Sequence, residues 1–240
     1  MIANHGSAAC KSLARIGVIK SKIVAWDWPQ DRTPDHYRPK KSFGAVFKLL
    51  FVGSVIESKG VGDVVRALPI LVNRDIPIEV TFVGDGQIAE YEALAARLNV
   101  GGHVQFVGRI SNSEVFGFML NTDAVVVPSR HSSPEGLPLT IYEALCSRTP
   151  IICSDHPMFV PYLVDGRSAL VFRSGDPADL AASVERLYEN NYLYQRLSEN
   201  SSEAWSGIQV RTKWGELVTS WVRGNKDDKS KLNEIRLRGF

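Results

Sequence analysis

From residue 47 to about residue 222, short apolar segments alternate with longer segments of helical periodicity. The apolar segments are mostly β-branched and lack polar alternation, which is typical of strands covered on both faces. This pattern predicts right-handed βαβ units and a doubly wound, mostly parallel α/β sheet. The expected strands are 48–53, 78–84, 104–108, 123–129, 150–154 and 169–172. The expected helices are 60–73, 87–98, 111–121, 137–147, 176–189, 191–205 and 209–222.

The composition supports a folded core and indicates no particular charged partner. Of the 240 residues, 44% are hydrophobic and 22% are charged, which excludes a wholly disordered chain, a collagen and a coiled coil. The formal net charge is +2, so nothing global points to nucleic acid. Residues 1–48 hold nine basic and three acidic side chains, and we interpret this excess first as a solvated linker.

The cysteine count and the absence of long apolar runs bear on the cellular compartment. Cys10, Cys146 and Cys153 are odd in number and form no Cys-x-x-Cys pair, which favours a reduced chain. No apolar run approaches the roughly 20 residues that a membrane helix needs, and the N-terminal residues lack the apolar region of a signal peptide. We therefore expect a cytoplasmic protein, while the basic N-terminal stretch leaves open a peripheral position at an anionic membrane.

Both ends of the chain differ from the alternating region. Residues 7–16 fit a short helix and residues 22–26 a short strand. Three prolines between residues 29 and 39 indicate an extended connection, and the whole stretch is too small to form a domain by itself. From 223 to 240 the chain is mostly charged or polar, so we expect a disordered terminus there.

Ligands of doubly wound sheets bind beyond the carboxyl ends of the strands, and the richest loop in such a position is 129–143. Pro138 suits the first turn of the following helix, whose free amides at 137–140 form an anion receptor. A nucleoside diphosphate sugar laid over this helix start would place its diphosphate at the amides. The groups on either side of it would then lie near Glu135 and Glu143. Carboxylates accept hydroxyl hydrogen bonds well, which suits a sugar or a ribose at these positions. The alternative interpretation is two ordinary surface acids.

Two further loops add weaker signals. The loop 53–60 has a glycine at each end, and Lys59 can place its ammonium over a phosphate, although a solvated lysine explains the pattern equally well. Gly84–Ala89 matches Gly-x-Gly-x-x-Ala, a weak dinucleotide fingerprint. The acid that should end the next strand, at 106–109, is absent. We therefore interpret this turn as the lining of a nucleotide pocket and rank NAD binding last.

No metal or cofactor chemistry is indicated by the sequence. The five histidines have no metal-ligand spacing, and the chain has no Gly-x-Ser-x-Gly, P-loop or Asp-x-Asp motif. If a diphosphate leaves at this site, helix amides and basic side chains must stabilise its charge. We therefore expect neither a metal nor a cofactor besides a donor substrate.

The segment 47–222 resembles the C-terminal, donor-binding domain of the family-four, group 1 retaining glycosyltransferases of the GT-B fold. The strongest match is PSRHSSPEGLPLTIYEALCSRTPIICSD at 128–155, which contains that family's Glu-x7-Glu motif as Glu135 and Glu143. LLFVGSVIESKGVGDVVRAL, FVGDGQIAEYEALAARL, VQFVGRIS and LVDGRSALVFRSGDPADLA match its other landmarks in order. The resemblance implies a Rossmann-like sheet that is one half of a GT-B enzyme, with C-terminal helices.

The resemblance also implies roles for single residues. Glu135 would contact the transferred sugar near the reacting carbon, Glu143 would bind the ribose, and Lys59 would hold the diphosphate. Further donor contacts would come from backbone groups of Gly136, Leu139 and Thr140, and from Gly84, Gly86, Arg109 and Ile110 around the base.

Two departures from the family's pattern matter. Ser54 stands where the family usually has an arginine on the diphosphate, and Arg130 is a candidate to substitute for it. The acceptor-binding domain is missing from this chain, because residues 1–46 resemble only its end and the interdomain linker. The expected division is therefore this remnant, a nucleotide-sugar-binding domain at 47–190, helices at 191–222 that pack back toward the interdomain side, and the tail 223–240.

The expected function is metal-independent transfer of a sugar, with retention, from a UDP- or GDP-sugar to a carbohydrate or lipid-linked acceptor. The acceptor domain would come from elsewhere, as a separate domain or protein partner. The alternative is a non-catalytic nucleotide-sugar- or partner-binding module, which the missing half and Ser54 favour. The interpretation as a NAD-dependent oxidoreductase, which we rank last, rests only on the Gly84–Ala89 motif. The exposed wall of an incomplete interdomain cleft also predicts self-association.

Overall fold

The computed structural model of the protein describes residues 1–28 and 31–236. These residues divide into two compact units. The larger unit is the contiguous segment Thr33–Trp205, and the smaller unit combines Met1–Arg32 with the chain from Ser206 onward. The alternating pattern of the sequence therefore falls mainly in the larger unit.

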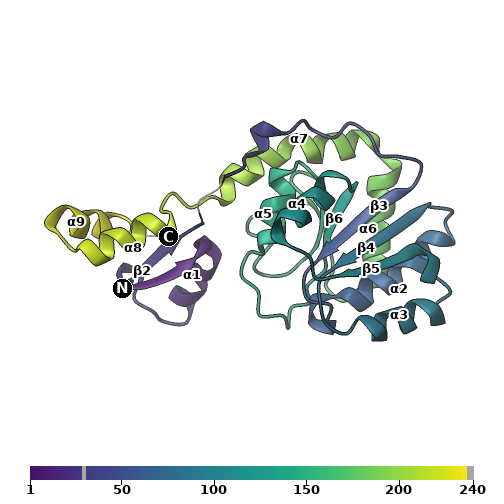
Figure 1. The fold of residues 1–240 in the computed structure, drawn as a ribbon, viewed down its shortest axis with the longest axis horizontal. Coiled ribbons are helices and arrows are strands. Elements are labelled where there is room, and N and C mark those ends of the chain that lie inside the picture. Colours follow the sequence, from purple (N-terminus) through teal and green to yellow (C-terminus); the bar gives the residue numbers. More distant parts are fainter. Residues whose placement is uncertain (29–30, 237–240) are drawn as a thin grey trace. The chain divides into compact units, whose positions relative to one another are not determined.

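A six-stranded sheet of order β5-β4-β3-β6-β7-β8 forms the centre of the larger unit (Figure 1). All neighbouring strands pair in parallel, which confirms the doubly wound α/β sheet that the alternation predicts. The four residues of β6 and of β7 are all buried and mostly β-branched, as expected for strands covered on both faces. The strands are β3 (Phe47–Val52), β4 (Ile78–Val83), β5 (Val104–Gly108), β6 (Ala124–Val127), β7 (Ile151–Ser154) and β8 (Leu170–Phe172).

Helices cover both faces of this sheet. The helices α2, α3 and α6 lie on one face, where α2 packs against both of the others, and α4 and α5 lie on the opposite face (Figure 1). The main core lies between the sheet and the α2–α6 layer, and α7 adds Leu193, Tyr194 and Leu197 to it. The helices are α2 (Val61–Val72), α3 (Ile88–Arg97), α4 (Asn112–Leu120), α5 (Leu139–Cys146), α6 (Pro177–Glu189) and α7 (Asn191–Ile208).

The proline-rich connection of the sequence belongs in part to the larger unit. The Lys40 amide donates to Ser198 Oγ at 2.7 Å, and Phe43 packs against the main core. Lys40 Nζ donates to the carbonyl oxygens of Met119, Leu120 and Thr122 at the end of α4. Burial lowers the pKa of Lys40 to about 8. The unit boundary thus follows Arg32, whereas the sequence division is at residue 46.

The smaller unit has a two-stranded parallel sheet of β1 (Ile2–His5) and β2 (Ile23–Trp26), connected by α1 (Gly6–Arg15). The sequence predicts α1 and β2 but not β1. On the C-terminal side, α8 (Trp214–Arg223) and α9 (Lys226–Glu234) pack together. Val24 of β2 forms a small core with Leu217 of α8 and Leu232 of α9. The smaller unit is therefore built from segments at both ends of the sequence.

The expectation of a disordered terminus from residue 223 is wrong for residues 226–234, which form α9. Asn225 caps this helix, because its side chain accepts from the Asp228 amide at 2.8 Å. Asp227 and Asp228 lie in the first turn, where acidic side chains are favourable, and Leu232 is buried. A good cap and one apolar anchor thus stabilise a segment that is polar almost throughout. Residues 237–240 lie outside the described residues.

Candidate functional site

Two loops meet at the carboxyl ends of β3 and β6, which are neighbours in the sheet. The Arg130 amide, in the loop after β6, donates to the Ser58 carbonyl, in the loop after β3, at 2.8 Å. Gly60 has a φ of 74°, and a Cβ there would lie 2.0 Å from the Pro128 carbonyl oxygen. Only glycine fits this contact, so the close approach of the two loops depends on it.

Lys59 and Glu135 meet where these loops come together. Lys59 Nζ forms an ion pair with Glu135 Oε1, and the Glu135 side chain is 7% exposed. Ser129 Oγ donates to the same oxygen at 2.6 Å, and Ser133 Oγ lies 3.4 Å from it. Charge-assisted hydrogen bonds of this kind compensate the carboxylate for its burial. The residues expected at the transferred sugar and at the diphosphate are therefore in contact with each other.

The start of α5 lies directly beyond this pair. Pro138 is the N-cap and Leu139 the first helical residue, and Thr140 Oγ1 donates to the Val52 carbonyl of β3 at 3.3 Å. This bond ties the helix start to the strand next to β6. Gly136 has open space where a side chain would be, and Leu139 is exposed. Glu143 follows one turn further along α5 and is half-buried. An exposed helix start beside a lysine is a favourable place for an anion.

Arg130 is held by carboxylates rather than directed to solvent. Its guanidinium makes two hydrogen bonds to Asp63 of α2, at 2.9 and 2.6 Å, and an ion pair with Glu57 at 2.6 Å. The hydrogen bonds to Asp63 raise the pKa of Arg130 further. Glu57 also accepts from Tyr91 Oη at 3.3 Å. Arg130 thus fixes the two loops to α2, and its charge is already balanced by two acids. Ser54 is exposed in the same loop as Lys59.

The glycine turn after β4 packs against the loop that carries Lys59. A Cβ on Gly84 would lie 1.8 Å from the Gly53 carbonyl oxygen, and one on Gly86 would lie 2.5 Å from that of Val55. The Gln87 amide donates to Val55 at 2.7 Å. Close packing of the two loops is therefore a sufficient physical reason for the Gly-x-Gly spacing.

The other sequence-predicted positions spread along the same edge. Arg109 is exposed and Ile110 half-buried after β5, which is separated from β3 by β4. They lie in the edge strand's loop, apart from the contact of Lys59 and Glu135. At this edge of the sheet, the charged pair follows β3 and β6, and the positions predicted to border the base follow β4 and β5.

Sequence reasoning missed the side chains that support Glu135. Ser129 and Ser133 donate to it, and His156 contacts the Ser133 carbonyl through Nε2 at 3.2 Å. Serines are too common for their type alone to be a signal. The one signal for His156 is its position just after β7, at the carboxyl edge where ligands of such sheets bind.

The described residues contain neither a candidate metal centre nor a helix that could span a membrane. Within residues 1–28 and 31–236, no group of three or more His, Cys, Asp and Glu side chains is arranged to hold a metal ion. In the same part of the chain, no helix has both the length and the apolar character that crossing a bilayer requires.

The parallel sheet and the helices on both of its faces define a Rossmann-like α/β domain. Residues 35–204 match the family model "Glycosyl transferases group 1", and the chain belongs to this family. Among curated relatives, the glycosyltransferase MJ1178 of Methanocaldococcus jannaschii is 30% identical over 155 residues, which cover 64% of this chain and 42% of that protein. The glycogen synthase of Mycobacterium tuberculosis is 29% identical over 227 residues, which cover 92% and 52%. The chain spans about half the length of the curated relatives it matches.

Solved structures show the same fold. Anabaena Alr3699/HepE in complex with UDP and glucose has a TM-score of 0.75 at 14% identity, covering 93% of this chain and 62% of that one. The C-terminal domain of the group 1 protein LpcC of Francisella tularensis has a TM-score of 0.60 at 16% identity, covering 79% of this chain and 97% of that domain. The Rossmann-like GT-B fold expected from the motifs is therefore confirmed.

Proposed function

We propose that this chain binds a nucleoside diphosphate sugar, a UDP- or GDP-sugar, as the donor half of a retaining, metal-independent glycosyltransferase. The observation that carries the proposal is the Lys59–Glu135 ion pair at the carboxyl ends of β3 and β6, directly before the start of α5. A cation, a buried carboxylate and a helix start at one sheet edge match the charges of a diphosphate joined to a sugar. The UDP and glucose bound by Alr3699/HepE support this choice of donor.

In the proposed reaction, the bond between the anomeric carbon and the diphosphate oxygen breaks, and the acceptor's hydroxyl oxygen forms a bond to that carbon on the same face. Negative charge grows on the leaving diphosphate, which takes up the hydroxyl's proton. Lys59 and the amides at the start of α5 stabilise that charge. A lysine has three donor hydrogens, so Lys59 can hold Glu135 and a phosphate oxygen at once. Glu135 accepts hydroxyl hydrogens of the sugar, and Glu143 accepts those of the ribose. The backbone at Gly84–Gly86, together with Arg109 and Ile110, borders the base.

Transfer also needs an acceptor site, which we assign to a domain or protein outside this chain. The acceptor itself, a carbohydrate or a lipid-linked sugar, would be selected there. The smaller unit, which contains segments from both ends of the sequence, is the part of this chain that we expect nearest to such a domain.

Calorimetric titration of the full chain with UDP, GDP, UDP-glucose, GDP-mannose and NADH tests the proposal. We expect one of the nucleotides and its sugar to bind, and Lys59→Ala to weaken the affinity about tenfold, the scale of a charge-assisted hydrogen bond. Lys48→Ala is the matched control, because Lys48 is an exposed lysine of β3 distant from the strand's carboxyl end. Absence of binding by any of them to a chain that still melts cooperatively would refute the proposal, and binding of NADH alone would favour the oxidoreductase.

A second candidate is a non-catalytic nucleotide-sugar-binding module. It is favoured by the site's charge, because Ser54 supplies none and Arg130 is paired with Asp63 and Glu57. Among the donor-loop positions Ser54, Lys59 and Arg130, only Lys59 has a basic side chain that is not paired with Glu57 or Asp63. Slow hydrolysis of the bound donor, followed by release of free sugar, would exclude this candidate.

A further inference from the structure

His156 contacts the loop that carries Glu135 through the Ser133 carbonyl, and no part in binding the donor is assigned to it above. It is the second residue after β7, the strand next to β6, and is 3% exposed. Its ring centroid lies 4.8 Å from that of Phe159 and 6.1 Å from that of His131. The ring therefore packs near two other rings, and its two nitrogens contact backbone groups.

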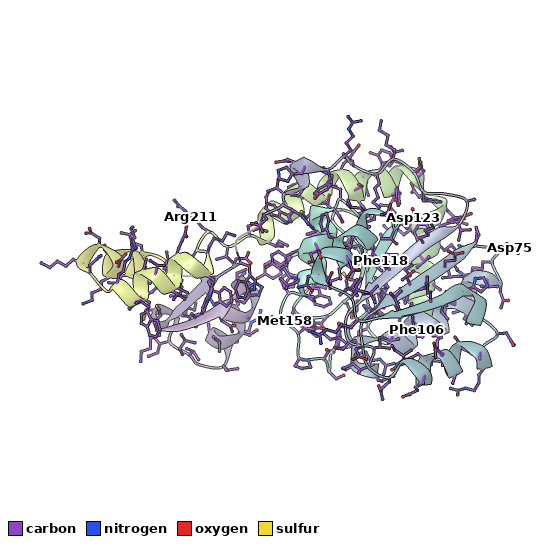
Figure 2. The ribbon with its side chains drawn as sticks, in the orientation of Figure 1. Asp75, Phe106, Phe118, Asp123, Met158 and Arg211 are labelled. Carbon is purple, nitrogen blue, oxygen red and sulfur yellow. The ribbon has the colours of Figure 1, made fainter. Side chains whose placement is uncertain are left out.

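The hydrogen bonds of His156 determine its tautomer. The Met158 amide lies 3.2 Å from Nδ1, and because an amide N–H can only donate, Nδ1 is the unprotonated acceptor. Nε2 lies 3.2 Å from the Ser133 carbonyl, which can only accept, so Nε2 carries the proton. Met158 is labelled in Figure 2, on the segment that follows β7. The neutral Nε2–H form satisfies both partners, and burial lowers the pKa of His156 in agreement with this form.

The Ser133 carbonyl accepts a second hydrogen bond, from the Glu135 amide at 2.9 Å. A bond from residue i+2 back to residue i closes a three-residue turn, here with Pro134 at its centre. The proline ring fixes φ near the value that such a turn requires. The orientation of Glu135 thus depends on a carbonyl that His156 holds from the neighbouring strand's loop.

We propose that His156 is a positioning residue for Glu135, acting through the Ser133 carbonyl and the turn around Pro134. The inference rests on the proposed donor site. It means that the part of this site expected to contact the sugar is held in place by a residue of the loop after β7. The charged and titratable groups that face the ring are Glu135, Lys59 and His131, and Asp155 holds His131 at 2.8 Å. None of them bonds Nε2 or Nδ1, so the backbone contacts decide the function of the ring.

Two variants separate the hydrogen bond from the volume of the ring. His156→Phe keeps an aromatic ring against Phe159 but removes the Nε2 donor, whereas His156→Gln places an amide donor near the position of Nε2. We expect His156→Phe to lower the affinity for UDP-glucose about tenfold while the affinity for UDP changes by less than about twofold, the scale of one lost hydrogen bond on the sugar side alone. His156→Gln should recover most of the loss.

His103→Phe is the matched control. His103 also contacts a backbone carbonyl, that of Ile78 at 2.9 Å, but at the amino end of β4. This variant should leave the affinities for UDP and UDP-glucose unchanged. Equal loss of both affinities in His156→Phe, or no loss of either, would overturn the inference, because a general structural role predicts no split between them.

A second measurement keeps the inference separable from the proposed function. Hydrogen exchange of the Glu135 amide, measured by NMR without any ligand, should be about tenfold faster in His156→Phe than in the parent chain and near the parent rate in His156→Gln. Unchanged exchange of this amide would overturn the inference. If no nucleotide sugar binds the parent chain, the proposed function fails while this exchange result still decides whether His156 holds the turn.

Discussion

At the scale of the residue, the candidate site is built around a single carboxylate oxygen. Glu135 Oε1 receives the ammonium of Lys59 and the hydroxyl of Ser129, and it does so almost out of contact with solvent. A lysine that is paired in this way presents less charge to a phosphate than a free one. Lys59 and Glu135 are therefore coupled, and a change in one alters what the other can bind.

Glu135→Gln should separate the two halves of a donor molecule. The amide keeps the shape of the side chain but no longer neutralises Lys59. Because Lys59 is 26% exposed and its charge is therefore partly screened, we expect the affinity for UDP to rise by up to about fivefold, the upper range of a screened ion pair. The affinity for UDP-glucose should gain less, because the amide is a weaker acceptor for sugar hydroxyls than the carboxylate. Calorimetry with both ligands measures this, and equal gains would contradict a contact of Glu135 with the sugar.

The neutral state of His156 gives stability a defined pH dependence. Because its folded pKa is lowered below the usual 6.5, the unfolded chain takes up a proton before the folded chain does. The stability that the neutral ring contributes is therefore fully present above about pH 6.5 and declines as the pH falls from there to the lowered pKa. Urea unfolding of the parent chain and of His156→Phe at pH 8, 6 and 5 should show their difference shrinking on acidification. A difference that grows instead would contradict the lowered pKa.

At the scale of the element, helices and strands that follow from a local sequence pattern are predictable, whereas those that depend on distant contacts or a single anchor are not. Strands such as β3 and β4 lie within a residue or two of the predicted positions, because a short, largely apolar run between turn residues is typical of a buried strand. β1 and α9 were missed, since β1 needs its partner β2 and α9 depends on a cap and one anchor. At the site, the loop positions of Lys59 and Glu135 were predictable. The pairing of Arg130 with Asp63 was not, because it joins residues 67 positions apart.

The end of α4 provides an element-scale prediction. The carbonyls of its last turn are held by Lys40, which comes from a segment about 80 positions away in the sequence. Replacing Lys40 by Met keeps much of the apolar stem but removes all three donors, so we expect a loss of about 1–3 kcal/mol in the free energy of unfolding. Lys41→Met, at the exposed neighbouring position, should change it by less than about 0.5 kcal/mol. Urea unfolding monitored by circular dichroism compares the two, and equal effects would contradict the capping role.

At the scale of the whole molecule, the protein has one unit that is contiguous and one that is not. Asp27 holds the discontinuous unit together, because its buried carboxylate accepts from His5 Nε2 at 3.1 Å and from the Val210 amide at 3.3 Å. Burial opposes its ionisation, but these hydrogen bonds outweigh it and the pKa of Asp27 lies below its usual value. The backbone of Asp27 also bonds Thr212 and Trp214. Segments from both ends of the sequence thus meet at one residue.

Asp27→Ala should unfold the smaller unit selectively. The variant leaves the donors of His5 and Val210 without their buried acceptor, which costs about 2–4 kcal/mol in that unit. We expect limited proteolysis to cut within 1–32 or after 206 at a much higher rate, while the segment 33–205 stays intact. Asp31→Ala, at an exposed position nearby, is the control. Equal resistance of both variants would contradict the role of Asp27.

Exposed apolar side chains on the smaller unit bear on the expectation of self-association. Ile16, Trp221 and Val222 are 78%, 67% and 74% exposed. Apolar surface of this kind favours association. Light scattering across a concentration series should therefore show a rising mean mass, and Trp221→Ser with Val222→Ser should lower it. A constant monomer mass in the parent chain would contradict the expectation.

The discontinuity of the smaller unit also has a consequence for how the protein is made. A chain leaves the ribosome from its N-terminal end, so α1 and β2 emerge long before α8 and α9, which complete their small core. At typical synthesis rates the interval is on the order of 10 to 30 s, long enough for the contiguous unit to fold first. During that time Leu217 and Leu232 are not yet there to cover Val24. During synthesis the protein therefore passes through a stage in which the six-stranded sheet has formed but the core of the smaller unit has not. A chaperone that binds residues 1–28 would act at that stage.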